Sequence, residues 1–502
     1  MKAIRILSAL LCLTLLLGIG TTSLAEEPLT FRLFMVVWGE PPAAMDEVVE
    51  AINTKLLGDG MDFQLEFNYV NAEVWETKLN MMLNTGESFG AFIVMQDWIP
   101  WSTYQARGAI QPVTQFIDEY GEHLKQCIPE SVFKAITSDA EVWGIPSYGS
   151  SISSNSEWIT VRTDLVDQYC DGKMPETNSE LLEYIKAVYE GCGGQAWPKI
   201  VTDGGSYLHR DYDSYPFTVF NEAIYIDKDG NAKAWIDTDE FRKDAEFWHT
   251  CYVNGWTDPD ILTLSDYVGR EAQFTDQNGS VRADINTSAI TREELEANVP
   301  GADLEAILLR PELGYFNATG LNHCWLVPVT AEHPELAVRF FDWLYTSQEN
   351  HDLLVYGVEG KHWVETDESI SYGDVTRKCI EVIRDEVGNP LYSSDFWALG
   401  NLNYKRYTTS NLSSMMNTDM HINYGDLPEI EGAALGFVFD PTNVETEWVN
   451  IQAEIASSIY PIKYGIVAYE DGFEDMRARF TAAGIDKVVE EYQRQLNVFL
   501  GK

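Results

Sequence analysis

The first hundred residues alternate between two kinds of apolar pattern, and this alternation restricts the fold more than any other feature of the chain. Phe31–Val37, Phe63–Tyr69 and Ala91–Met95 have the short apolar or alternating patterns of strands. Helical spacing fills the two intervals, over Met45–Leu57 and Val74–Asn84. The order strand, helix, strand, helix, strand predicts an α/β fold with a mostly parallel sheet covered by helices.

Aromatic and acidic residues follow two of these predicted strands. Trp38 and Glu40 come after the first strand, and Asp97 and Trp98 come after the third. In sheets of this kind, ligands bind outside the carboxyl ends of the strands. We therefore expect Trp38, Glu40, Asp97 and Trp98 to face a ligand.

Residues 1–25 have the features of a secretory signal peptide. Lys2 and Arg5 precede a mostly apolar run, and Ser23-Leu24-Ala25 forms a small-x-small cleavage site. Cys12 lies inside the apolar run and makes a poor lipobox, so we expect no lipid anchor. The sequence predicts export across the cytoplasmic membrane, to a periplasm or the cell surface.

The mature chain is too long for one growing hydrophobic core, which predicts at least two domains. The net charge of −45 would repel nucleic acid and anionic lipid, and it suits a neutral solute. The six cysteines beyond Cys12 are scattered singly. Their spacing suits no zinc site, and we expect mostly free thiols, with Cys170 and Cys192 a weak candidate pair.

The amino-acid composition changes between Val142 and Trp158, where the chain is rich in Gly, Ser and Pro. Such a stretch is typical of a chain that leaves one lobe and enters another. A second α/β region follows, including a helix over Phe241–Val253. Between Ile224 and Trp235 the sequence predicts a hairpin around Asp229-Gly230. An EF-hand is the alternative there, but no acid occupies its twelfth position.

Strand and loop character returns near Tyr315–Pro328, and Ala331–Val364 follows as a predicted pair of helices and a loop. Pro334 begins the first helix, Ser347 caps the second, and Gly357 ends it. The loop after Gly357 carries the string YGVEGKHWV.

This segment resembles a signature of extracellular solute-binding proteins of bacterial ABC importers, in the large branch that takes up oligosaccharides. Similar motifs occur in the family's order along most of the chain. They are Trp75–Gly86, Gly108–Pro112, Val142–Pro146, Val161–Leu165, Gly436–Asp440 and Ala483–Lys487.

The resemblance implies a two-lobed, type II periplasmic-binding-protein-like fold, each lobe a mostly parallel sheet flanked by helices, with extra C-terminal helices. It also implies hinge closure over a neutral oligosaccharide and delivery to a membrane permease, by a protein that works as a monomer. The expected division is 1–25 signal peptide, 26–155 lobe 1, 156–319 lobe 2, 320–366 returning part of lobe 1, and 367–502 the rest of lobe 2 with C-terminal helices.

Within this frame, five further residues are candidates for the ligand site. Tyr148 follows the first predicted crossover, Trp325 follows a Gly-Leu-Asn-His turn at the second, and Glu359 lies in the signature loop. Trp397 and Phe437 are candidates from the second lobe. For Glu359 and its neighbour His362, local pairing that stabilises the loop is an equal alternative.

Two other functions remain open. The same fold could bind a peptide or a cationic solute, with acidic residues around aromatic faces. A secreted glycoside hydrolase would also be acidic and rich in Trp. The enzyme reading is disfavoured because a GxSxG match at Gly86–Gly90 and an SxxK match at Ser131–Lys134 lack their structural context. The eight His show no triad or metal spacing, so we expect no catalytic residue, cofactor or metal.

Overall fold

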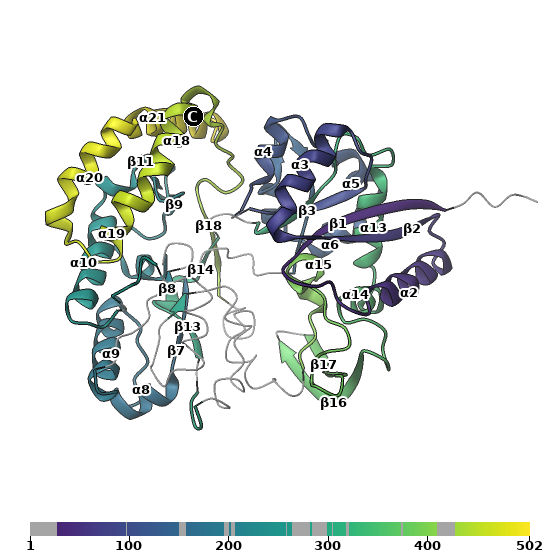
Figure 1. Cartoon of the computed structure of the whole chain (residues 1–502), viewed down its shortest axis with the longest axis horizontal. Helices are drawn as coiled ribbons and strands as arrows, with labels where there is room; N and C mark the ends of the chain where they lie inside the picture. Colours follow the sequence, from purple (N-terminus) through teal and green to yellow (C-terminus); the bar gives the residue numbers. More distant parts are fainter. Residues whose placement is uncertain are drawn as a thin grey trace, which may run out of the picture.

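The protein is described by a computed structural model in which two lobes lie side by side (Figure 1). The predicted signal peptide lies outside the described residues. These are residues 28–96, 98–149, 157–194, 200–201, 206–257, 259–263, 282–283, 299–303, 305–317, 321–372, 375–408 and 427–502.

Lobe 1, on the right in Figure 1, is built on a five-stranded sheet with the order β2-β1-β3-β15-β6. Its strands are β1 (Leu29–Val37), β2 (Phe63–Asn71), β3 (Ala91–Met95), β6 (Ile145–Pro146) and β15 (His323–Leu326). β1 pairs in parallel with β2 and with β3, as the alternating pattern predicted. β15 runs antiparallel to both of its neighbours, β3 and β6.

Lobe 2 departs from the expected mostly parallel sheet. Its sheet has the order β13-β7-β12-β8, formed by β7 (Trp158–Val161), β8 (Ile200–Val201), β12 (Arg282–Ala283) and β13 (Glu305–Leu308). Of the three pairings, only β12 with β8 is parallel. The physical reason is the crossing of the chain between lobes. β7 brings the chain into lobe 2 and β13 leads it out, so two such neighbours must point in opposite directions.

The helices of lobe 1 begin and end largely where the sequence placed them. They include α2 (Met45–Gly58), α3 (Trp75–Thr85), α13 (Glu335–Leu344) and α14 (Gln348–Val355). Ser347 caps α14 by accepting a hydrogen bond from the Asn350 amide. Gly357 takes a left-handed conformation at φ 87° just after that helix, and its amide donates to the Asp352 carbonyl.

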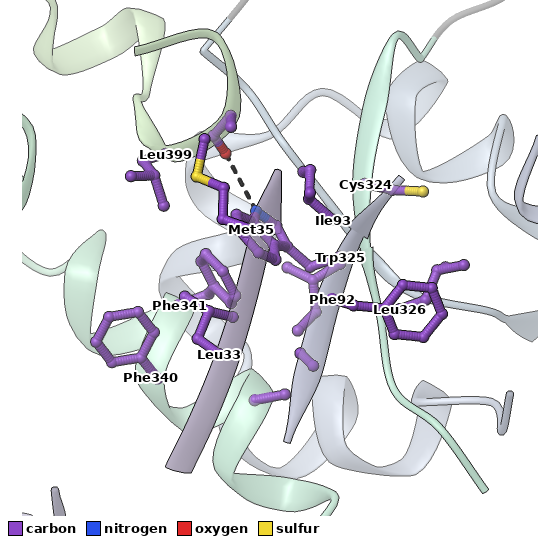
Figure 2. Close-up of a cluster of buried hydrophobic side chains, with 14 of the residues drawn as sticks. Leu33, Met35, Phe92, Ile93, Cys324, Trp325, Leu326, Phe340, Phe341 and Leu399 are labelled. Atoms are coloured by element: carbon purple, nitrogen blue, oxygen red, sulfur yellow. Dashed lines mark hydrogen bonds between the residues drawn. The ribbon is translucent and has the colours of Figure 1, made fainter. Parts of the chain in front are cut away.

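Trp325 belongs to the core of lobe 1 and not to a ligand-facing surface, so its prediction as a ligand residue is wrong. Its side chain is fully buried, and its ring lies 5.2 Å from that of Phe341. Figure 2 shows Trp325 among Met35, Phe92 and Phe341, with its indole nitrogen donating to the Ala398 carbonyl oxygen at 3.1 Å. Both faces of this sheet carry helices, so the side chains of a central strand are enclosed on either side.

The returning part of lobe 1 continues beyond residue 366. A hairpin of β16 (Trp363–Tyr372) and β17 (Val375–Val382) follows the signature loop. After it, Tyr392, Ala398 and Leu399 are buried in the same hydrophobic cluster as β1 and β3. This packing places residues 392–399 in lobe 1, and we propose that the returning part extends from 320 through this segment.

Lobe 2 has a core of its own, covered by long helices. These include α9 (Asn178–Gly191), α10 (Asp239–Val253), α18 (Glu445–Glu454), α20 (Tyr469–Ala483) and α21 (Ile485–Phe499). The predicted hairpin is confirmed as β10 (Ile224–Ile226) and β11 (Ala232–Ala234). In its turn, the Asp227 carboxylate accepts hydrogen bonds from the amides of Asp229 and Asn231.

A buried arginine holds both chain segments that enter and leave lobe 2. The Arg210 guanidinium is fully buried and donates to the Glu157 carboxylate at 2.7 Å and to the Gly314 carbonyl at 2.6 Å. It also donates to the Leu309 carbonyl at 2.6 Å. Burial raises the pKa of Glu157, and the charge and hydrogen bonds of Arg210 oppose that rise.

Two general features of the described residues bear on the earlier expectations. The six cysteines beyond Cys12 all lie within this part of the chain, and each is a free thiol. No helix in it is long and apolar enough to cross a bilayer.

Replacing Trp325 with Phe is expected to lower the free energy of unfolding by about 2 kcal/mol, because the change removes buried volume and the hydrogen bond to Ala398. Urea unfolding followed by circular dichroism measures the change. The control is Trp38→Phe, at an exposed position, where we expect a change within about 0.5 kcal/mol. Unchanged stability of the Trp325 variant would contradict its assignment to the core.

Candidate functional site

Two tryptophans lie together at the carboxyl ends of β1 and β3. Trp38 directly follows β1, and Trp98 lies three residues after β3. Their ring centroids are 6.5 Å apart, and their side chains are 60% and 39% exposed. Exposed apolar side chains that gather in one patch mark interaction sites, and this edge of the sheet is where such folds bind ligands.

A third tryptophan joins them from far along the sequence. Trp397 lies in α15 (Phe396–Leu399), and its ring centroid is 6.0 Å from that of Trp38 at an interplanar angle of 62°. We call Trp38, Trp98 and Trp397 the tryptophan cluster. The sequence predicted all three as ligand residues, but it placed Trp397 in the second lobe. The packing of α15 against β15 through the Trp325–Ala398 bond instead holds Trp397 on lobe 1.

His323, at the start of β15, lies against the tryptophan cluster from the protein side. Its ring centroid is 4.5 Å from that of Trp397. Burial lowers the pKa of His323 to about 4, because a charged imidazolium would lose its hydration there. The ring is therefore neutral at pH 7, and it packs against the Trp397 ring at an interplanar angle of 56°.

The sequence predicted two acids beside the cluster, Glu40 and Asp97. Glu40 is exposed, two residues after Trp38, and the turn between them passes through Gly39 at φ 104°. Asp97 lies outside the described residues. Sequence reasoning missed a third acid, Asp395, whose carboxylate accepts a hydrogen bond from the Trp397 indole nitrogen at 3.0 Å. Its only sequence signal was its place two residues before Trp397.

Tyr148 lies at the first crossing but is largely enclosed. Its side chain is only 9% exposed and belongs to the lobe 1 core, while its carbonyl accepts a hydrogen bond from the Leu402 amide. This contact ties the crossing to the returning segment. The structure does not bring the Tyr148 ring into the tryptophan cluster.

The signature loop after α14 is held by its own residues. The His362 side chain is buried and its Nδ1 accepts from the Val358 amide at 3.0 Å. The Trp363 indole nitrogen donates to the Gly357 carbonyl at 2.8 Å. Glu359 is exposed at the tip of this loop. These bonds favour local stabilisation, the alternative reading of the loop, for His362 and Trp363.

Phe437 lies elsewhere, between the lobes. Its ring packs against those of Tyr492 at 5.1 Å and Phe499 at 5.6 Å. It borders a cavity of about 1060 Å³ that is lined by residues 130–140 of lobe 1 and by residues 433–438 and 494–500 of lobe 2. No member of the tryptophan cluster lines this cavity, so Phe437 and the cluster belong to different surfaces.

The site around the tryptophan cluster offers aromatic stacking faces and hydrogen-bonding groups. Its described groups are three indoles, a neutral imidazole and two carboxylates. Within the described part of the chain, no group of three or more His, Cys, Asp or Glu residues is placed to hold a metal ion.

Comparison with known proteins gave matches along nearly the whole chain. A family model described as bacterial extracellular solute-binding protein matches residues 47–356, and a model of a domain of unknown function matches residues 433–501. A carbohydrate ABC transporter substrate-binding protein of Streptococcus pneumoniae is 22% identical over 475 residues, which cover 92% of this chain and 89% of that protein.

Solved structures share the fold at lower identity. The N-glycan transport solute binding protein of Streptococcus pneumoniae is similar with a TM-score of 0.74 and 17% identity, covering 94% of this chain and 99% of that one. A milk-oligosaccharide (HMO) binding solute-binding protein of Bifidobacterium longum infantis is similar with a TM-score of 0.66 and 14% identity, covering 94% and 99%.

Lowering the pH from about 6.5 to about 4 is expected to lower the free energy of unfolding. In the unfolded chain His323 takes up a proton near pH 6.5, whereas in the folded protein it does so only near pH 4. Between these values the unfolded state binds more protons, so stability falls with pH, by at most about 1.4 kcal/mol per pH unit for this proton.

Urea unfolding at a series of pH values tests this expectation. His323→Gln should flatten the slope between pH 4 and 6.5. His333→Gln is the control, because that side chain is 45% exposed and away from the cluster. Parallel pH curves for the wild type and the His323 variant would rule out a buried neutral His323.

Proposed function

Because the chain belongs to the bacterial extracellular solute-binding proteins, we propose that it captures a neutral oligosaccharide between its lobes and delivers it to the permease of an ABC importer. The observation that carries the proposal is the tryptophan cluster, which exposes two indoles at the carboxyl ends of β1 and β3. Flat aromatic faces suit the C–H surfaces of sugar rings, and carboxylates suit their hydroxyls.

The relatives support a sugar as the solute. The similar proteins are described as binding or transporting carbohydrate, N-glycan and milk oligosaccharide. Kestose, a fructose-containing oligosaccharide, is bound in another protein of the same fold from Streptococcus pneumoniae. The net charge of −45 disfavours an acidic sugar, because an anionic ligand would be repelled over most of the surface.

Capture requires that the lobes close by a hinge, and one of the segments that connect the lobes contacts both of their cores. In residues 433–439, Leu435 is buried in the lobe 1 core, whereas Phe437 and Phe439 pack on the lobe 2 core. Gly436, at φ 80°, lies so close to lobe 1 that a Cβ would come within 2.6 Å of the Lys134 carbonyl oxygen. A solute that prefers the closed arrangement would shift the population toward it.

Proteins of this family work outside the cytoplasmic membrane. We further propose that this one acts as a monomer, without a lipid anchor, and docks on its permease when loaded. We propose no nucleic-acid partner, given the acidic surface.

The second candidate keeps the fold and changes the solute. Exposed indoles beside Glu40 and Asp395 would also suit an organic cation or a peptide amine through cation–π contact. We place this second, because the sugar-binding descriptions of the relatives favour an oligosaccharide. A hydrolytic activity is not part of the proposal.

A thermal-shift screen tests the proposal. The mature protein is mixed with neutral oligosaccharides, such as a mannose–N-acetylglucosamine disaccharide, a milk tetrasaccharide and kestose, and with polyamines and short peptides. We expect a sugar to raise the melting temperature, because a ligand that binds only the folded state stabilises it. We also expect no release of reducing ends. A shift with polyamines or peptides alone would refute the sugar proposal.

Trp38→Ala is expected to weaken binding of the sugar found in that screen by about tenfold or more, because the variant loses an exposed stacking face. Isothermal titration calorimetry measures the change. Val387→Ala is the control, since that side chain is 81% exposed in the turn after β17. Equal affinities of the wild type and the Trp38 variant would remove the cluster from the binding site.

A further inference from the structure

Asp395 occupies the N-cap position of α15 but does not cap that helix. An Asp at this position usually accepts hydrogen bonds from the first free amides of the helix. Here the side chain makes no such bond. One carboxylate oxygen, Oδ1, instead accepts from the Trp397 indole nitrogen at 3.0 Å. The carboxylate is therefore turned away from the helix amides and toward the ring that joins the tryptophan cluster.

The other oxygen of Asp395 has no donor among the residues that the structure describes. An ionised carboxylate can accept about four hydrogen bonds. The side chain is partly buried, and no salt bridge or second hydrogen bond reaches it within those residues. Burial raises the pKa of Asp395, while the Trp397 bond lowers it by less. A partly buried carboxylate with spare acceptor capacity can accept a hydrogen bond from a bound solute.

A second under-satisfied group lies near Asp395. The Tyr69 hydroxyl, near the end of β2, is buried without a hydrogen-bond partner in the described part of the chain. Burial raises the pKa of Tyr69, and the nearby Tyr392 and Asp395 raise it further. Two polar groups with unused hydrogen-bonding capacity thus lie near each other, and one of them, Asp395, bonds an indole of the tryptophan cluster.

We propose that Asp395 is a specificity-determining residue, whose free carboxylate oxygen accepts a hydrogen bond from one hydroxyl of the sugar ring that stacks on the tryptophan cluster. The proposal rests on the proposed function, since it names how the same site reads its solute. Stacking alone does not distinguish one hydroxyl pattern from another, because every pyranose or furanose ring has an apolar face. A buried acceptor rejects a sugar that lacks the matching hydroxyl, because the acceptor then stays unpaired.

The pairing with Trp397 gives the test its design. Asp395→Asn keeps one amide oxygen that can still accept from the Trp397 indole, and it replaces the free oxygen with a donor. Asp395→Leu removes both functions. If Asp395 only positions Trp397, the Asn variant binds like the wild type and only the Leu variant is impaired. If Asp395 contacts the sugar, both variants are impaired.

Calorimetric titration uses the wild type, both variants and the control Asp367→Asn, which changes an exposed carboxylate on β16. The probes are the mannose–N-acetylglucosamine disaccharide, the milk tetrasaccharide and kestose, followed by monodeoxy derivatives of whichever binds. We expect Asp395→Asn to weaken binding about 10- to 100-fold, as for the loss of a charge-assisted hydrogen bond. Near-UV circular dichroism of the free variant should match the wild type.

Binding of monodeoxy sugars distinguishes a contact between Asp395 and the sugar from a purely structural role of Asp395. One monodeoxy sugar should bind the wild type more weakly than its parent, and the Asn variant should not distinguish the two. Wild-type affinity in Asp395→Asn, or a deoxy penalty that persists in it, would overturn the assignment of Asp395 alone. Absence of binding by the wild type to every probe would instead refute the proposed function, and this inference with it.

Discussion

The insertion of β15 between β3 and β6 is the constraint on which lobe 1 depends. The strand belongs to a part of the chain that is more than two hundred residues away from β3, yet it completes the middle of the sheet. Trp325, at its centre, fills the space between the sheet and α13 and reaches the Ala398 carbonyl (Figure 2). The N-terminal segment alone would leave both β3 and β6 with an open edge and the core with a large gap. Lobe 1 can therefore form only after the chain has gone to lobe 2 and returned.

The same constraint decides where the candidate site lies. The indole bond to Ala398 holds α15 against β15, and α15 carries Trp397. Trp38 and Trp98 come from loops that the first three strands alone could position. Trp397, His323 and Asp395 come only with the returning segment. The first part of the lobe supplies two exposed indoles, and the returning segment adds the third indole and the carboxylate acceptor. The candidate site is therefore complete only when both parts of the lobe have folded together.

This origin explains what the sequence could and could not predict. Trp38 and Trp98 were found because a general rule ties the carboxyl ends of parallel strands to ligands, and local patterns locate those ends. The family resemblance is confirmed by the match over residues 47–356. Trp325 was misplaced because the local sequence after a turn is the same whether the residue faces solvent or is buried between a sheet and a layer of helices. Apart from lying two residues before Trp397 and Trp325, Asp395 and His323 carry no local signal, since their environment is made by residues distant in sequence. The strand directions of lobe 2 were missed for a related reason. Hydrophobic periodicity locates strands, but it does not show which strands lead the chain from one lobe to the other and therefore run antiparallel to their neighbours.

The two lobes hold their crossings by different kinds of contact. In lobe 2 the Arg210 guanidinium binds the entering segment at Glu157 and the leaving segment at Leu309 and Gly314, all buried. Removing either charge would leave the other unpaired in the interior, so this attachment is rigid. On the lobe 1 side, the buried Ser147 hydroxyl donates to the Trp397 and Ala398 carbonyl oxygens, both at 2.8 Å, and an exposed ion pair joins Lys134 to Glu431 at 3.2 Å. Exposed ion pairs contribute little and are readily exchanged for water. Each lobe therefore fixes its own crossing by buried hydrogen bonds, and the exposed ion pair adds little to the connection between the lobes.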